Sequence, residues 1–484
     1  MANKDVKYIE LITAILQNIV SEENRVNWDE FLIQAKDLIV SSYTGGNLNT
    51  FKGVWKRKFQ IALDNLDYKL RKDSGNRNVW QSISGELKMI RDSPSVYSAI
   101  TPSSSKSSEK SSSINSKHNT LVSTETKARL IEKISQLNDH SKWRLSSGKF
   151  VEDAVCLVID KCQYEHPAFS FIVDTSDLIW KKVFTKEELR EIKNYKAPVL
   201  PSIDEDVKNY LTSFDQDVFK KAKDFYDHAF ESKFEFGTSK TKRWIQKSVI
   251  EVAEVFEDDE RIELSDFSEG DLSNKIWQFV FKCFKESHVD AKLGERVSTA
   301  SSLGRNESRG LEGLGRRERK VTGVKVDILF KAGRHEVGCC EVGKEDVLPI
   351  DDKYLDDGMM KLPKTLRDML SRLVNANPIK VNSLYTVGFL MMGLDLELLI
   401  MDIPSGNTIT RISRTKKLPF PDQASNIGID LTALLETVLI GRKLMEDVEA
   451  LISCSRKRKP VELNNDDSED EAAAPFLSHS FNIK

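Results

Sequence analysis

Two short apolar segments joined by a tight turn constrain the fold of this chain more than any other feature. Residues 324–330 and 336–342 are rich in Val, Ile, Leu, Phe and Cys, and Ala332-Gly333-Arg334 lies between them as a hairpin turn would. We expect further regular elements around this hairpin: helices at 271–284, 363–374 and 430–454, and strands at 384–392, 396–403 and 408–412. This order predicts an α/β domain whose sheet is covered by helices on both faces.

Length and composition indicate a multi-domain chain with α+β and α/β parts. At 484 residues the chain exceeds what one hydrophobic core usually organises, and 39% hydrophobic residues are enough for packed cores. We expect a helical module at 1–95, a Ser-rich disordered linker at 96–124, a helical region at 125–260, the α/β domain at 261–454 and a basic, then acidic, disordered tail at 455–484.

Charge, cysteines and hydropathy indicate where such a protein works. The net charge of −3 means that any surface for nucleic acid must be local, because the whole chain is not a polycation. The six cysteines have no repeating spacing, which is typical of reduced thiols inside a cell. No window approaches the roughly 20 apolar residues that cross a bilayer, and the first residues do not resemble a signal peptide. We therefore expect neither a membrane partner nor secretion.

Each strand of the predicted hairpin carries one carboxylate among apolar neighbours. Asp327 lies in the first strand and Glu341 in the second, so the two acids lie nearly opposite each other across a short turn. Carboxylates in apolar strands are costly unless they are paired or bind a cation. Two converging acids with a nearby lysine, here Lys344, suit a magnesium site for phosphodiester hydrolysis.

Structural roles are the alternative for these acids. Asp327 and Glu341 would then form salt bridges at the sheet edge with nearby basic residues: Lys325, Lys331, Arg334 or Lys344. Glu269 follows Ser268 at the expected start of a helix, where an acid is also favoured by capping and by the helix dipole. Lys364, Arg367 and Asp368 are expected on a solvated helix face.

Four segments carry a resemblance to a known family. They are Ser268-Glu269-Gly270-Asp271, Gly323-Val324-Lys325-Val326-Asp327, Cys340-Glu341-Val342-Gly343-Lys344 and Lys361-Leu362-Pro363-Lys364-Thr365-Leu366-Arg367-Asp368-Met369. They resemble restriction-endonuclease-like, PD-(D/E)xK-type families of early-diverging filamentous fungi, which are related in fold to the nuclease-like ends of Crinkler-type proteins. With the helical segment from Leu145 to Ile172, the resemblance covers residues 142–421.

The resemblance implies roles for individual residues. Asp327 and Glu341 would be ligands of Mg²⁺, or of Mn²⁺, and Lys344 would be the charge-stabilising base. Glu269 would complete the site, with Glu295 as a second candidate. The sequence departs from the family pattern, because the lysine usually lies two residues after the glutamate, where this chain has Gly343. Since strand side chains alternate, Lys344 should point away from Glu341 unless the glycine turns it back.

Basic clusters are candidate surfaces for nucleic acid and for nuclear import. They are Lys52, Lys56, Arg57 and Lys58 in the N-terminal module, Arg316 and Arg317 in a Gly/Arg-rich loop, and Arg456, Lys457, Arg458 and Lys459 before the acidic tail. Each is also compatible with an ordinary solvated surface. We therefore expect a protein of the nucleus and cytoplasm that binds the nuclear import machinery. Its expected activity is magnesium-dependent hydrolysis of nucleic acid, with DNA favoured over RNA as the substrate. The alternatives are a catalytically inactive DNA-binding or effector protein that keeps the nuclease fold, and a protein-interaction scaffold.

Overall fold

The computed structural model describes most of the chain. The described residues are 4–20, 25–41, 52, 55–56, 58–60, 62–63, 66, 68–70, 79–80, 83, 121–216, 218–235, 237–257, 262, 267–307, 309–310, 319–344, 354–453 and 477–481. Contacts divide the chain into two compact units, of which the first consists mainly of Met1–Ser113. The second contains nearly all the rest. Each unit is considered by itself.

The first unit is a small helical body with an aromatic core. It contains α1 (Lys4–Ile19), α2 (Trp28–Gln34) and α3 (Lys36–Ser41), with the two-residue strands β1 (Arg25–Val26) and β2 (Lys69–Leu70) paired in parallel. Asn27 begins α2, and its side chain accepts the Asp29 N–H at 2.7 Å, as is typical of the residue before a helix. The Phe59 ring lies 4.9 Å from Trp28 and 4.8 Å from Phe31, so a residue well beyond α3 closes this core.

The second unit is built on a mixed sheet of eight strands. Along its main path the order is β3-β9-β8-β7-β6-β5-β4, and β10 pairs with β8. The strands are β3 (Ile172–Asp174), β4 (Val289–Val297), β5 (Lys325–Ala332), β6 (His335–Gly343), β7 (Tyr385–Met392), β8 (Asp395–Asp402), β9 (Thr410–Arg414) and β10 (Leu418–Pro419). Strands β4, β5 and β6 form an antiparallel meander, and β6 then pairs in parallel with β7. The hairpin and the later strands are therefore where the sequence predicts them.

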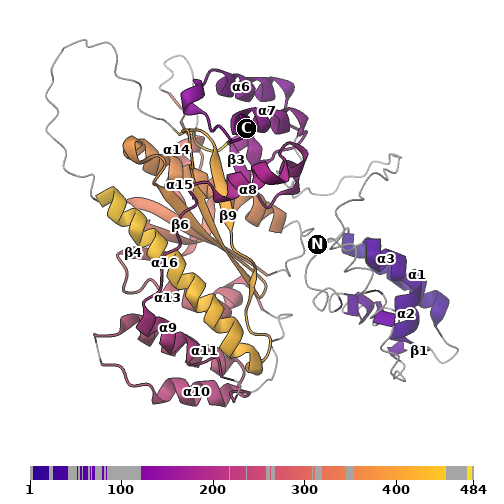
Figure 1. Ribbon diagram of the computed structural model, residues 1–484. Coiled ribbons are helices and arrows are strands. Elements are labelled where there is room, and N and C mark those ends of the chain that lie inside the picture. The colour runs from indigo at the N-terminus through magenta and orange to yellow at the C-terminus, as the bar shows by residue number, and fades with distance from the viewer. Residues whose placement is uncertain are drawn as a thin grey trace, which may run out of the picture. The chain divides into compact units, whose positions relative to one another are not determined.

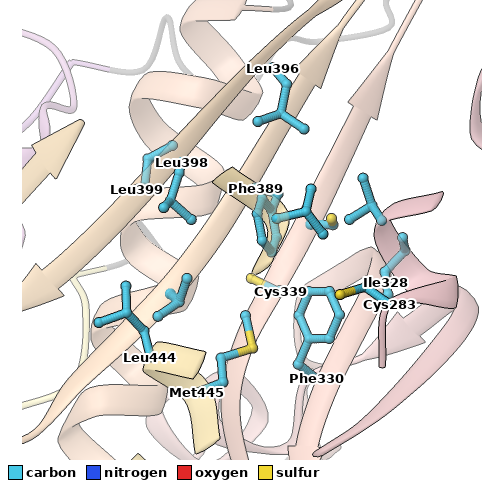
Figure 2. Close-up of a cluster of buried hydrophobic side chains, with 14 of the residues drawn as sticks. Cys283, Ile328, Phe330, Cys339, Phe389, Leu396, Leu398, Leu399, Leu444 and Met445 are labelled. Atoms are coloured by element: carbon cyan, nitrogen blue, oxygen red, sulfur yellow. The ribbon is translucent and has the colours of Figure 1, made fainter. Parts of the chain in front are cut away.

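Helices cover both faces of this sheet, as Figure 1 shows. The chain crosses from β6 to β7 through the π-helix η6 (Tyr354–Lys361) and the helix α15 (Leu362–Ala376), as a parallel pair requires. Helix α16 (Thr432–Ser453) packs on the opposite face. A methyl group at Gly388 would touch Leu366 of α15 at 2.9 Å, and one at Gly441 of α16 would lie 2.4 Å from Phe389. Neighbouring residues of β7 thus face different helices, and Figure 2 shows the apolar cluster under α16.

Helices from the middle of the chain complete the second unit. They are α6 (Thr124–Ser135), α7 (Val151–Lys161), η2 (Asp139–Ser141), η3 (Pro167–Ser170), η4 (Leu178–Lys182), α8 (Lys186–Asn194), α9 (Glu205–Thr212), α10 (Ala222–Glu231), α11 (Lys240–Val255), α12 (Glu269–Asp271), η5 (Leu272–Ile276), α13 (Gln278–Lys282) and α14 (Thr299–Arg305), with η7 (Pro378–Lys380), η8 (Ala424–Asn426) and η9 (Ile427–Leu431) later in the chain. Thr185 and Glu188 form a capping box at the start of α8. The region expected as a separate helical part also supplies β3 to the sheet, and Trp244 to its core.

Three features differ from the sequence-based expectations. Arg367 and Asp368, expected on a solvated helix face, are 0% and 2% exposed, because α15 is covered on its outer side as well. Residues 477–481 of the expected disordered tail pack on the fold, where Leu477 is buried. The segment Ala424–Ser453 has the length and composition of a membrane span, and 44% of its most apolar window is buried inside the fold.

A candidate metal site at the β5–β6 hairpin

Strand pairing brings Asp327 and Glu341 together. Strands β5 and β6 are antiparallel, and the register that pairs Ile328 with Cys340 places Asp327 beside Glu341. The carboxylate of Asp327 also accepts the backbone N–H of Val342 at 2.7 Å through Oδ2. Glu341 is only 1% exposed. The two acids predicted from the sequence therefore form one cluster on the face of the sheet that meets η6.

A lysine from the crossover, not from the hairpin, contacts Glu341. Lys361 ends η6, and its Nζ lies 2.5 Å from Glu341 Oε2 and 3.7 Å from Asp357 Oδ1. The second oxygen of Glu341, Oε1, is buried and has no hydrogen-bond partner among the residues that the structure describes. A buried carboxylate oxygen without a donor is unfavourable, and it leaves one coordination position directed at the cluster.

Lys344 is the lysine that the sequence predicts for this site. Lys344 is exposed directly after the end of β6 at Gly343. Lys344 lies beyond the last strand residue, so its expected role as the charge-stabilising base stays a prediction. Lys361 reaches Glu341 instead, from a segment that the chain brings over the hairpin.

Burial and like charges oppose the ionised form of both acids. Burial raises the pKa of Glu341 well above its usual range, although the Lys361 ammonium opposes the shift. Burial also raises the pKa of Asp327, against the Val342 N–H and Lys361, and Glu269 and Asp357 raise it further. For Lys361, burial would lower the pKa, but the charges of Glu341 and Asp357 outweigh burial and raise it. The cluster thus has excess negative charge that a cation would compensate.

Glu269 belongs to this cluster through its charge. The capping role that an acid could have at this helix start is filled by Asp271, whose Oδ2 accepts the Ser268 N–H at 2.9 Å while its own N–H donates to Ser268 Oγ at 3.1 Å. Glu269 is not part of that capping box, and its charge helps to raise the pKa of Asp327. This favours the site role over the capping role.

Glu295, the second candidate for the helix acid, lies at the edge of the site. It sits in the bulge of β4, where Gly294 and Glu295 have φ of 80° and 33°. Its carboxylate is 2.7 Å from Lys325 Nζ and 71% exposed. Lys325 lowers the pKa of Glu295 most, and Lys361 adds to this effect. Glu295 is therefore paired with Lys325 of the neighbouring strand β5 rather than grouped with Asp327 and Glu341.

Asp357 is a site residue that the sequence reasoning missed. Its side chain is 18% exposed, and its negative charge raises the pKa of both Asp327 and Glu341. The expected helix began at Pro363, so residues 354–361 were left out of the crossover helix. The four-residue spacing of Asp357 and Lys361 on one helical face was the available signal.

Arg414 of β9 holds the segment that carries Asp357 and Lys361. Its Nη2 donates to the Gly358 carbonyl at 2.7 Å, and its Nε and Nη1 donate to Asp174 at 2.7 Å and Glu397 at 3.1 Å. Tyr354 donates its hydroxyl hydrogen to the same Glu397 at 3.1 Å. Because both ends of this network are buried, η6 is fixed to the sheet by charge-assisted hydrogen bonds.

The predicted basic clusters are only partly described. In the first unit, Lys52 Nζ lies 5.4 Å from the ring centroid of Trp80, and burial followed by Lys56 lowers the pKa of Lys52. Lys58 Nζ lies 5.8 Å from the ring centroid of Trp55. The remaining residues of the three predicted clusters lie outside the described residues: Arg57, Arg316, Arg317, Arg456, Lys457, Arg458 and Lys459.

The acid cluster fits a hard divalent cation by its chemistry. Within the described part of the chain, no three His, Cys, Asp or Glu side chains are already closed around one point as metal ligands. The orphaned Oε1 of Glu341 and its neighbour Asp327 nevertheless offer the oxygen donors that Mg²⁺ and Mn²⁺ prefer.

Comparisons with known proteins add no relative to this description. No family model matches the chain, and no curated protein or solved structure matches it either.

Proposed function

We propose that the second unit is a PD-(D/E)xK-type domain that hydrolyses phosphodiester bonds of nucleic acid with a divalent metal ion. The observation that carries this proposal is the buried Glu341 with its unpartnered Oε1, next to Asp327 and contacted by Lys361. The order of helix, antiparallel meander, crossover helix and parallel strand agrees with the restriction-endonuclease-like fold that the sequence resembles. The proposal includes the resemblance to fungal families that are related in fold to the nuclease-like ends of Crinkler-type proteins.

Each residue has a stated task in the proposed reaction. Asp327 and Glu341 would hold the metal ion through one oxygen each. A bound Mg²⁺ would polarise the scissile phosphate and lower the pKa of a water molecule. Lys361, whose pKa is raised, stays an ammonium and offsets the negative charge that develops on the phosphate. Glu269 and Asp357 add negative charge around the site.

The test is cleavage of DNA and of RNA with Mg²⁺ or Mn²⁺ by the full chain. We expect Asp327→Ala, Glu341→Ala and Lys361→Met to lower the rate by about 100-fold or more, since each removes a group that touches the reacting centre. The matched control is Lys344→Met, which should stay within about threefold of the wild type because the ammonium found beside Glu341 is that of Lys361.

Two outcomes would contradict the assignment. If Lys344→Met abolishes cleavage and Lys361→Met does not, the assignment of Lys361 as the lysine of the site is wrong. If the wild type does not cleave any of these substrates with either ion, the hydrolytic function is wrong.

An inactive nucleic-acid-binding protein is the second candidate. The observation that favours it is the short Lys361–Glu341 pair, in which an ammonium already neutralises the carboxylate that a metal ion would bind. It predicts binding of DNA that weakens steeply with salt, without turnover. Metal titration separates the two, because only the hydrolytic reading predicts that Mg²⁺ raises the Tm of the wild type and not that of Asp327→Ala.

A further inference from the structure

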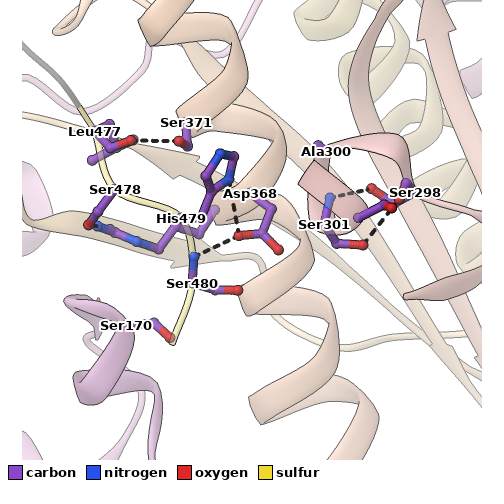
Figure 3. A network of polar contacts seen from close by, with 12 residues as sticks. Ser170, Ser298, Ala300, Ser301, Asp368, Ser371, Leu477, Ser478, His479 and Ser480 are labelled. Carbon is purple, nitrogen blue, oxygen red and sulfur yellow. Dashed lines mark hydrogen bonds and ion pairs between the residues drawn. The ribbon is translucent and has the colours of Figure 1, made fainter. Parts of the chain in front are cut away.

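The chain's own C-terminal peptide lies in a polar-lined groove away from the acid cluster. Residues 477–481 run between α15, α14 and η3, as Figure 3 shows, and residues 454–476 lie between them and the last described residue of α16. Leu477 is 0% exposed and Ser480 is 9% exposed. The peptide is therefore embedded in the second unit rather than resting on its surface.

Side chains of the groove grip the backbone of this peptide. Asn375 binds both polar atoms of Leu477: its Oδ1 accepts the Leu477 N–H at 2.9 Å and its Nδ2 donates to the Leu477 carbonyl at 3.1 Å. An amide that pairs with the N–H and C=O of one residue replaces the neighbouring strand that an extended peptide would otherwise need. Ser371 Oγ donates to the same carbonyl at 2.6 Å.

Side chains of the groove also accept hydrogen bonds from the last described residues of the peptide. Asp368 Oδ1 accepts the Ser480 N–H at 2.7 Å, and Ser170 Oγ accepts the Phe481 N–H at 2.9 Å. Asp368 and Ser170 are each 2% exposed. Buried polar groups such as these are costly without partners, so the groove is complementary to a peptide in this position.

Side chains of the peptide are recognised as well. Leu477 joins the large apolar core, and the Phe481 ring lies 5.7 Å from the Phe169 ring. The wholly buried Arg367 donates through Nη2 to Ser478 Oγ at 3.4 Å. His479 fits only because residue 304 is glycine, since a Cβ there would lie 2.7 Å from His479 Cβ and Cγ. The groove therefore contacts the side chains of the peptide as well as its backbone.

We propose that this groove is a peptide-binding site and that its ligand is the C-terminal peptide of this protein, which binds as a separable segment and can be supplied by a second copy. Residues 454–476 could extend at most on the order of 80 Å, so the covalent link does not limit the peptide to one position. The proposal does not depend on the proposed hydrolytic function.

The test uses the full chain and a fluorescein-labelled peptide of residues 475–484. In the wild type, the tethered peptide competes at a high effective concentration, so the labelled peptide should bind weakly. In full-length Leu477→Asp, the chain's own peptide carries a charge where an apolar side chain is buried, and the labelled peptide should bind at least about tenfold more tightly. A labelled peptide with Leu477→Asp is the matched control and should not bind.

Two further variants keep the result decisive. Ser480→Pro removes the N–H that Asp368 accepts and restricts the peptide backbone at this position, so it frees the groove even if Leu477→Asp does not fold. Adding Gly304→Ala to either variant should weaken binding of the labelled peptide at least about tenfold, because the new methyl group overlaps the position of His479, while the helix α14 itself accepts alanine. Equal binding to the wild type and to both released variants, absence of binding to a folded released variant, or no effect of Gly304→Ala would each overturn the proposal.

Discussion

At the scale of single residues, the cluster around Glu341 is costly for folding. Glu341 and Asp327 both have raised pKa values because burial opposes their charge, and Asp357 increases the repulsion. Lys361 offsets part of this cost. Groups that are unfavourable for stability and face one another are typical of sites where function requires the strain.

Asp327→Asn should therefore stabilise the protein at neutral pH. A folded pKa above the unfolded value means that the protonated form is favoured in the fold, so its stabilising effect is present below the unfolded pKa and is lost as the pH rises through the folded pKa. At neutral pH we expect the Asn variant to melt about 1–3 °C higher, because it keeps an acceptor for the Val342 N–H without the charge.

The pH dependence provides the control for this prediction. Below about pH 3, Asp327 is protonated in both states, so the difference in Tm between wild type and Asp327→Asn should vanish. Thermal melts by circular dichroism across this range measure it. A gain that is independent of pH would show that the charge of Asp327 is not its cause.

At the scale of elements, the contact between β6 and β7 decides where the acids lie. These strands are parallel neighbours, and the crossover between them carries Asp357 and Lys361 over the hairpin. Gly338 of β6 has no room for a side chain, since a Cβ would lie 2.2 Å from the Val387 carbonyl oxygen and 2.7 Å from Met445 Cε. Helix α15, which belongs to this crossover, also contacts the C-terminal peptide through Ser371 and Asp368.

Gly338→Ala should destabilise the second unit by about 2–4 kcal/mol, since the added methyl group must push apart two paired strands or displace α16. Chemical denaturation followed by fluorescence measures this free energy of unfolding. Gly310→Ala is the matched control, because nothing lies within 4 Å of its added methyl group. Its effect should stay within about 0.5 kcal/mol, and an equally large loss there would remove the packing explanation.

At the scale of the whole molecule, the chain consists of two units with separate cores. The apolar core of the first contains Trp28, Phe31 and Phe59, and its described members all lie within residues 12–83. The core of the sheet, in turn, extends from Ile172 to Leu477. Units with their own cores fold independently when few contacts join them.

Deleting residues 1–113 should therefore leave the second unit folded. We expect the Tm of residues 114–484 to lie within about 2 °C of the corresponding transition of the full chain. Differential scanning calorimetry of both proteins measures it. Loss of a cooperative transition in the shorter protein would show that the two units depend on each other.

Local sequence by itself determined the elements and the pair of acids. The hairpin, the helix start at Asn27 and the capping box of Thr185 and Glu188 are encoded by alternation and by contacts a few residues apart, so they are readable without the fold. Asp327 and Glu341 belong to the same group, because a short turn joins their strands. Glu269 was a candidate through the family resemblance, and the structure adds that Asp271 is the acid of the capping box.

Tertiary structure alone decided which lysine meets Glu341, which face of α15 is buried and where the C-terminal peptide lies. Lys361 reaches Glu341 because the crossover must return over the sheet, and the pairing of β6 with β7 fixes that crossover. Arg367 and Asp368 resemble a solvated face by composition, yet they are covered by segments more than a hundred residues away in the sequence. Such contacts depend on how distant elements pack, and no local pattern encodes that packing.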